Sequence, residues 1–126
     1  MKLLIITVCG GIGSLLRYLL SGWCQQWTGG TFPSGTLAVN LIGCLLIGLS
    51  GALFFGPHMV RDEYRLAVMV GLLGGFTTFS SFAWESLRLI EDREVWLALA
   101  NIAVSNVLGL FAAWAGHRAG LYFFGA

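Results

Sequence analysis

The chain has 126 residues and the composition of a membrane protein: 57% are hydrophobic, 10% are charged, and the mean hydropathy is +0.82. Soluble domains carry about 25% charged residues, so we expect an integral membrane protein. The formal net charge of +1 argues against nucleic acid as a partner. At roughly 20 residues a span, the length allows about four spans, so we predict one membrane domain over residues 1–126.

Apolar stretches predict four transmembrane helices, at about residues 3–20, 35–55, 66–90 and 95–116. The first two are joined by a predicted loop over residues 21–34, in which Trp23 and Trp27 suit the lipid headgroup region. A charged loop over residues 56–65 precedes the third span. The turn at residues 91–94 is short, so spans three and four should be antiparallel neighbours. We therefore expect an all-α membrane protein with both termini on one side.

Polar positions stand out in the first two spans. Arg17 either snorkels to the interface or faces the bundle interior and holds a carbonyl or carboxylate there. Thr36 and Asn40 are i and i+4, so they share one face of the second span. Asn40 either joins helices by hydrogen bonding or lines a water-filled path and donates its amide N–H to an anion.

The third span contains an unusual segment, GLLGGFTTFSSFAWE at residues 71–85. Adjacent glycines weaken a helix, and the hydroxyls that follow offer freed backbone groups local partners. Irregular backbone at membrane depth survives only where protein buries it or a watery cavity meets it. The segment therefore predicts a helix broken at the midplane, with an ion or substrate site there. A kinked but continuous helix, with small residues used for close packing, is the alternative.

Polar residues also mark the end of span three and the first half of span four. Glu85 and Arg88 are three residues apart, so Glu85 is either half of a helix-end ion pair or a carboxylate at the mouth of a permeation path. Asn101 and Ser105 are i and i+4, with Asn106 beside them, so span four carries a polar stripe. Three such residues favour a polar track over simple helix adhesion.

The loop charges barely specify an orientation, because the lysines and arginines divide four against three between the two sides. We therefore expect the chain to insert both ways round. Four thin, glycine-rich helices are too few to enclose a hydrophilic path, so the polar faces need a partner chain. The economical assembly is an antiparallel homodimer whose two-fold axis lies in the membrane plane and whose broken segments meet at the midplane.

Three segments resemble the signature segments of the Fluc (CrcB) fluoride channels: GGIGSLLRY at residues 10–18, GTLAVNLIG at 35–43 and GLLGGFTTFSSF at 71–82. Length, span number and balanced loop charge match too, so the resemblance covers essentially the whole chain. It implies a dual-topology homodimer in the bacterial plasma (inner) membrane, with two pores that export fluoride passively and relieve fluoride toxicity. It also implies one structural sodium ion at the dimer axis.

The resemblance assigns residues as well. Backbone carbonyls at the break hold sodium in that family, and the matching positions here are Gly74 and Thr77. The pore phenylalanines match Phe79 and Phe82, and the span-two asparagine matches Asn40. We also assign pore positions to Ser80, Ser81 and Asn106, and pore-mouth or structural positions to Glu85, Arg17 and Thr36.

Elementary chemistry agrees with these assignments. A half-helix that ends near Gly74 presents unpaired carbonyl oxygens, and the C-terminal end of a helix favours a cation. Phe79 and Phe82 are three residues apart and point roughly the same way. The edge of an aromatic ring is positive, so the two rings could solvate a small anion without a fixed charge. Ordinary packing against lipid or core is the alternative.

Two other classes of protein compete with a channel. A small proton-coupled exporter would need a titrating carboxylate near the midplane, and Glu85, the one candidate within the spans, lies too near an end. A non-transporting assembly protein would leave the string at residues 77–82 unexplained. We do not expect an enzyme, because no nucleophile–base pair or metal constellation is present.

Overall fold

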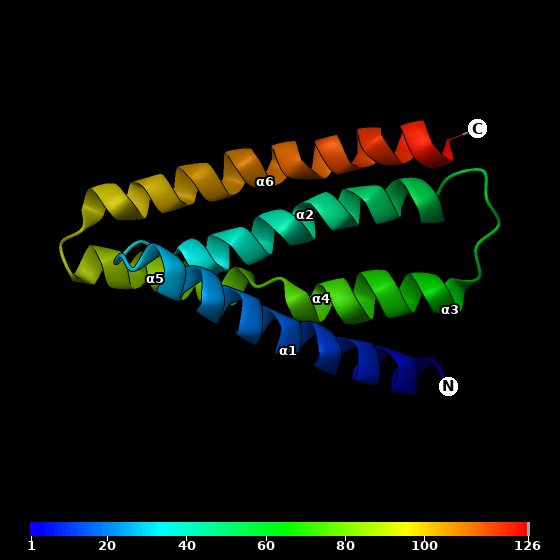
Figure 1. The fold of residues 1–126 in the computed structure, drawn as a ribbon, viewed down its shortest axis with the longest axis horizontal. Helices are drawn as coiled ribbons and strands as arrows, with labels where there is room; N and C mark the ends of the chain where they lie inside the picture. The colour runs from blue at the N-terminus through cyan, green and yellow to red at the C-terminus, as the bar shows by residue number, and fades with distance from the viewer. Residues whose placement is uncertain (126) are drawn as a thin grey trace.

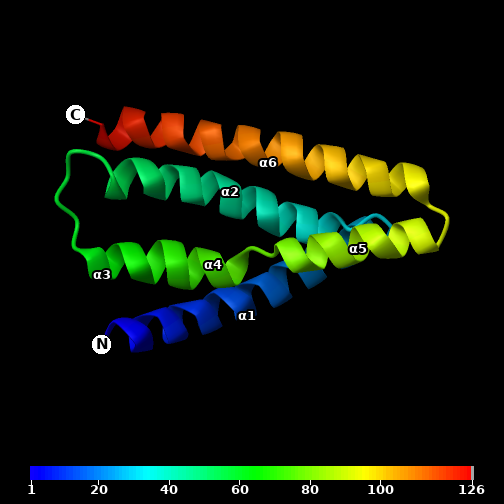
Figure 2. The same cartoon turned by 180° about the vertical axis from the view of Figure 1, so that it is seen from behind.

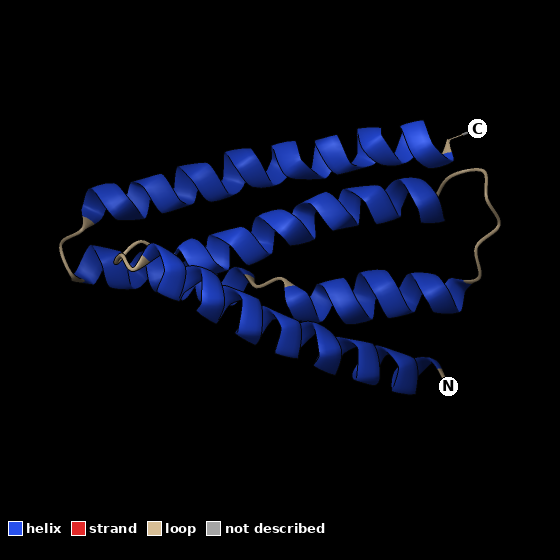
Figure 3. Cartoon of the chain, in the orientation of Figure 1, coloured by secondary structure: helices blue, strands red, loops and turns tan. Residues whose placement is uncertain are grey.

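The computed structural model describes residues 1–125, and every regular element in that range is a helix (Figures 1 and 3). Four helical runs are long and apolar enough to cross a membrane, which confirms the predicted all-α fold. The elements are α1 (Lys2–Thr28), α2 (Ser34–Phe54), α3 (Asp62–Arg65), the π-helical η1 (Leu66–Leu72), α4 (Leu73–Phe76), α5 (Phe79–Glu91) and α6 (Val95–Phe124). Elements α3 to α5 form the third run. Both termini and the α2–α3 loop lie at one end of the bundle, as predicted (Figure 1).

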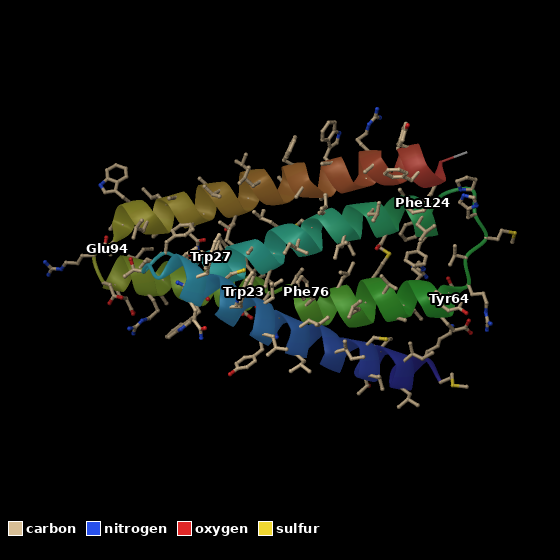
Figure 4. The ribbon with its side chains drawn as sticks, viewed as in Figure 1. Trp23, Trp27, Tyr64, Phe76, Glu94 and Phe124 are labelled. Atoms are coloured by element: carbon tan, nitrogen blue, oxygen red, sulfur yellow. The ribbon has the colours of Figure 1, made fainter. Side chains whose placement is uncertain are left out.

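Helix α1 is longer than predicted. It continues through residues 21–28, so the predicted loop is wrong over that part, and it ends at Gly29, whose φ of 65° is left-handed. The Gln25 side chain fastens this end by donating to two carbonyls of the following loop, at 2.9 and 3.0 Å. The rings of Trp23 and Trp27 stack one helical turn apart, with centroids separated by 6.5 Å (Figure 4).

Two other boundaries also differ from the prediction. The third run begins at Asp62, inside the predicted loop over residues 56–65, and α6 continues past residue 116 to Phe124. Both extensions carry polar and aromatic side chains, which suit the membrane interface. Helical geometry therefore extends beyond the apolar stretch in three of the four spans, and α2 keeps the predicted bounds to within one residue.

Glycines set the closest contacts between helices. An ideal Cβ on Gly48 of α2 would lie 2.0 Å from a backbone carbonyl oxygen of α6, and one on Gly116 of α6 would lie 2.0 Å from a carbonyl oxygen of α2. Helix α1 meets the third run in the same way, because a Cβ on Gly13 would lie 2.1 Å from the carbonyl oxygen of Leu72. Only glycine allows backbones to approach this closely.

The third run leaves helical geometry between α4 and α5 (Figure 2). Helix α4 ends at Phe76. Thr77 (φ −83°, ψ 157°) and Thr78 (φ −151°, ψ 110°) are extended, and α5 begins at Phe79. The π-helical segment η1 precedes this point, and π-helical geometry frequently marks functional sites. We call Thr77 and Thr78 the interruption.

Candidate functional site

Asn40 on α2 binds both polar backbone groups of Thr78 in the interruption. Its Nδ2 donates to the Thr78 carbonyl at 3.0 Å, and its Oδ1 accepts from the Thr78 N–H at 2.8 Å. In a continuous helix that N–H would donate to the carbonyl of Gly74. Asn40 thus stabilises the extended backbone and removes the helical donor from the Gly74 carbonyl. The amide has a second N–H, so a role as a donor to an anion is compatible with this contact.

Thr78, which the sequence analysis did not single out, caps α5. Its Oγ1 accepts from the N–H of Ser81 at 3.1 Å, and it lies 3.0 Å from the Ser81 hydroxyl and 3.2 Å from that of Ser80. A threonine directly before a helix is a typical N-cap, and that signal could have identified it. The hydroxyls of Ser80 and Ser81 are therefore gathered around this cap.

Arg17 faces the protein. Its Nη1 donates to the Thr77 carbonyl at 3.4 Å, and the residue is half-buried. On the same helix, the Ser14 hydroxyl donates to the carbonyl of Gly75 at 3.5 Å. Two roles were open for Arg17: snorkelling to the interface, or facing the bundle interior and binding a carbonyl or carboxylate. In the structure Arg17 binds a carbonyl. Helix α1 thus contacts the backbone at the end of α4 through two side chains.

Glu85 is bound by α2 and not by its neighbour along the helix. The Thr36 hydroxyl donates to Glu85 Oε1 at 2.7 Å, while Oε2 is buried without a hydrogen-bond partner among residues 1–125. Of the two alternatives for Glu85, the ion pair with Arg88 is not formed: Arg88 Nη1 lies 4.0 Å from Glu91 Oε2 at the exposed end of α5. Thr36 and Asn40 do share one face of α2, and that face meets the third run.

A cavity of about 330 Å³ lies beside the interruption. Six predicted site residues line it: Asn40, Gly74, Thr77, Phe79, Phe82 and Asn106. The remaining lining residues, which the prediction did not assign to the site, are Gly43, Cys44, Ile47, Met69, Leu73, Thr78 and Ser105. The predicted residues that lie outside this lining are Arg17, Thr36, Ser80, Ser81 and Glu85. Because Gly74 and Phe79 are exposed, the cavity opens onto the surface of the single chain.

Phe79 and Phe82 lie side by side on α5. Their ring centroids are 5.3 Å apart and their planes are inclined by 49°. The tilt turns the positive edge of each ring in a different direction. Phe79 is 77% exposed, so packing in the core of one subunit does not account for it. It faces lipid, a partner chain or a pore.

The polar stripe of α6 divides between the cavity and the protein interior. Asn106 is exposed and lines the cavity, with its Nδ2 donating to the Ile102 carbonyl of its own helix at 2.7 Å. Ser105 also lines the cavity, and its hydroxyl donates to Asn101 Oδ1 at 3.3 Å. Asn101 is only 2% exposed. Two members of the stripe therefore reach the cavity and the third is enclosed.

The end of α4 offers oxygen atoms that fit a hard cation. Gly74 is exposed, its carbonyl lacks a helical donor, and a Cβ there would meet only Met69 O, at an ordinary 3.7 Å. The Thr77 carbonyl oxygen has two lone pairs. The hydrogen bond from Arg17 uses one of them, so the other can bind a cation. The C-terminal end of a helix carries partial negative charge. In residues 1–125 no group of three or more His, Cys, Asp or Glu could hold a metal ion.

Sequence comparison relates the chain to a known family. The profile described as "CrcB-like protein, Camphor Resistance (CrcB)" matches residues 4–117. The chain is 45% identical over 116 residues to a protein of Solibacter usitatus, an alignment that covers 92% of this chain and 95% of the relative. It is 45% identical over 114 residues to a protein of Geobacter sulfurreducens, covering 90% and 92%. It is also 49% identical over 108 residues to a protein of Pseudomonas putida, covering 85% and 87%.

All three relatives bear the name fluoride-specific ion channel FluC. They are named as channels and not as enzymes, in agreement with the expectation from sequence. The profile spans most of the chain, and the identities extend over nearly the full length of each relative. The chain therefore belongs to the CrcB family.

Proposed function

We propose that this chain is a fluoride channel, which exports fluoride passively and thereby relieves fluoride toxicity. The observation that carries the proposal is the cavity at the interruption. It joins the Asn40 amide, two phenylalanines and Asn106, and its lining residues include no charged side chain. Fluoride holds its water strongly, so a path that replaces this water needs several weak donors. A fixed cation in the wall would bind the ion too tightly to release it. The name shared by the relatives points the same way.

In this proposal, each group in the cavity has a separate task. Asn40 holds the interruption open through Thr78 and turns its second amide N–H toward the ion. Phe79 and Phe82 offer their ring edges, which carry partial positive charge and bind an anion weakly. Asn106 completes the path from α6.

The functional unit in this proposal is an antiparallel homodimer with dual topology and two pores. Its support is the exposure of the cavity on a single chain: Gly74, Phe79 and Asn106 are all exposed. Gly74 is exposed and its carbonyl lacks a helical donor, and an unpaired backbone group is strongly unfavourable in lipid, so another protein surface should cover this site. A second copy related by a two-fold axis would do so with the same residues and would bring both interruptions to the midplane.

We also propose a structural sodium ion at the dimer axis, held by the carbonyl oxygens of Gly74 and Thr77. The support is the carbonyl geometry at the end of α4, where Asn40 takes the donor that Gly74 would otherwise use. Half-helix C-terminal ends and unwound carbonyls bind sodium in other membrane proteins. The ion would supply positive charge where two helix ends meet. The guanidinium of Arg17, 3.4 Å from the Thr77 carbonyl, weakens the cation site at that oxygen.

We place the protein in the bacterial plasma (inner) membrane as a multi-pass protein, in keeping with its four apolar helical runs. The second candidate is a small dual-topology proton-coupled exporter. One observation favours it: Oε2 of Glu85 is buried and unpartnered among the described residues. Glu85 is absent from the lining of the cavity, however, so proton binding there would not be coupled directly to an ion in the cavity.

The deciding experiment measures fluoride efflux from liposomes that contain the purified protein, using a fluoride-selective electrode. A channel passes fluoride down its gradient without a proton gradient, and imposing one leaves the rate unchanged at matched membrane potential. Efflux that requires a proton gradient would favour the exporter. An absence of fluoride efflux under both conditions would reject transport of fluoride by this chain.

A separate experiment tests the dual topology. Tags at the C-terminus should be accessible from both sides of the membrane, because the loop charges divide four against three. Two lysines added to the loop after Ile90 should bias the population one way. A wild-type protein found wholly in one orientation would rule out the antiparallel dimer.

A further inference from the structure

A buried chain of hydrogen bonds connects α5 to α6. Asn101 on α6 is 2% exposed, and its Nδ2 donates to the hydroxyl of Ser86 on α5 at 2.9 Å. The Ser86 hydroxyl in turn donates to the carbonyl of Phe82 at 2.8 Å. On its other side, Asn101 Oδ1 accepts from Ser105 at 3.3 Å. We call Asn101, Ser86 and Ser105 the α5–α6 link.

The link runs from Ser105 to the backbone of Phe82, and both of these residues line the cavity. Phe82 lines it from α5 and Ser105 lines it from α6, whereas Asn101 and Ser86 lie outside its lining. Helix α6 packs mainly along α2, through the close contacts at Gly48 and Gly116. The link is thus a specific polar tie between α6 and the half-helix that carries both pore phenylalanines.

The chemistry of the link requires an amide. Asn101 must donate to one hydroxyl and accept from another at the same time, which a carboxylate or an aliphatic side chain cannot do. The donated bond crosses to α5 and the accepted bond stays within α6, so removal of the amide breaks the contact between the helices and leaves the Ser105 hydroxyl without its acceptor.

We infer that Asn101 is a positioning residue for conduction: through Ser86 it fixes the rotation of α5 and thereby the ring of Phe82 in the cavity wall. This inference rests on the proposed function, since it concerns the path that fluoride takes. Asn101 need not touch the ion. The spacing of polar residues along α6 placed Asn101 in a stripe, but nothing in the sequence singled out Ser86, because its partner is supplied only by the packing of α5 on α6.

The first test compares hydroxyl variants in the liposome efflux assay. Ser86→Ala should lower fluoride efflux by about tenfold, because a buried amide loses its acceptor. Ser86→Thr keeps the hydroxyl and should restore the rate to near wild type. Thr7→Val is the matched control: the Thr7 hydroxyl makes the same bond to the carbonyl four residues earlier, at 2.8 Å, but reaches no second helix. Full-rate efflux from Ser86→Ala would overturn the inference.

The second test separates positioning from general packing. In a Phe82→Ile background, Asn101→Leu should cause little further loss of efflux, because its effect passes through the Phe82 ring. Losses that multiply independently would overturn the inference. Hydrogen exchange then gives a readout free of transport: in Asn101→Leu, amides of α5 should exchange faster while those of α2 stay protected. Unchanged exchange in α5 would also count against it.

The two proposals fail in different ways. If the wild type passes no fluoride, the proposed function is rejected, and the exchange data still report on the link. If the wild type conducts and both Ser86→Ala and Asn101→Leu conduct at full rate with folded protein by size-exclusion elution, the channel stands and the inference is wrong.

Discussion

Glycines do opposite things in two regions of this molecule. Along α2 and α6, Gly48 and Gly116 let two backbones touch, since a Cβ on either would lie 2.0 Å from a carbonyl oxygen of the facing helix. At the interruption, Gly74 has free space around it, and the nearest atom to its Cβ position is Met69 O at 3.7 Å. Glycine thus allows close backbone contact between α2 and α6, whereas at Gly74 it leaves unfilled space.

This contrast separates packing from function. The α2–α6 contact is complete within one chain, so its glycines are explained by subunit folding. The space at Gly74 has no such explanation within one chain, and it adjoins exposed residues of the cavity. We therefore expect substitutions in the first region to abolish folding, and substitutions in the second to abolish transport while the subunit still folds.

The largest effect should come from Gly116→Val. The new side chain would overlap backbone of α2, which cannot move away as a flexible side chain could, and overpacking of this kind costs about 1–3 kcal/mol or more. We expect little folded protein by size-exclusion elution in detergent. Gly51→Ala on α2 is the matched control, because no atom lies within 4 Å of its Cβ position. A folded, stable Gly116→Val protein would refute the packing role.

Gly74→Val should separate folding from transport. A Cβ at Gly74 meets only Met69 O at 3.7 Å, so the subunit should fold, but bulk at Gly74 would crowd the axis of the proposed dimer. We expect fluoride efflux to be lost and elution to shift toward the monomer. Efflux at the wild-type rate would argue against a shared central ion.

Fold and site differed in how far the sequence could predict them. The apolar stretches located all four helical runs, and the charged turn at residues 91–94 placed the start of α6 at Val95. The end of α1 was missed, because one glycine and several polar residues do not stop a helix that a left-handed Gly29 then caps. Helix boundaries at an interface depend on such caps more than on hydropathy.

In the site, the sequence did not predict which residues are hydrogen-bond partners. The i, i+4 spacing put Thr36 and Asn40 on one face, but only the packing of α2 on the third run reveals that they bind Glu85 and Thr78. Spacing left an ion pair with Arg88 open for Glu85, whereas the partner in the structure is a hydroxyl from another helix. Local spacing identifies which residues share a face, and tertiary contacts decide their partners.

A moderate effect is expected from the aromatic pair. Phe79→Ile and Phe82→Ile keep apolar bulk but remove the ring quadrupole, so efflux should fall by roughly tenfold for each while the protein stays folded. The assay is electrode-detected efflux, with size-exclusion elution as the folding control. If both variants conduct at full rate, the rings only pack, and the anion path must depend on other groups.

Asn40→Ala examines the same cavity from α2. The change removes an anion donor and also leaves both backbone groups of Thr78 without their partner, which costs about 1–3 kcal/mol for a buried group. We expect lower efflux together with a lower melting temperature, unlike the phenylalanine variants. A drop in stability with efflux unchanged would limit Asn40 to holding the interruption.

The smallest effect should come from Thr77→Ser, which tests whether the cation site uses the backbone. Serine keeps the carbonyl and the hydroxyl that donates to Leu73 O at 3.0 Å, so efflux should stay within about twofold of wild type. The lost methyl group packs against Gly43, where a Cβ would lie 2.1 Å from Thr77 Cγ2. Its removal should cost about 1 kcal/mol of stability.

That packing suggests a sharper control. Gly43→Ala alone should destabilise the protein, because the new Cβ overlaps the Thr77 methyl group. Combined with Thr77→Ser it should regain stability, because the added methyl fills the space that the lost one leaves, and the other atoms near that Cβ position lie at 3.6 Å. Thermal unfolding of the single and double variants measures this. If Thr77→Ser abolishes efflux while the double variant is stable, the threonine side chain itself acts in the site, and a site built from carbonyl oxygens alone is wrong.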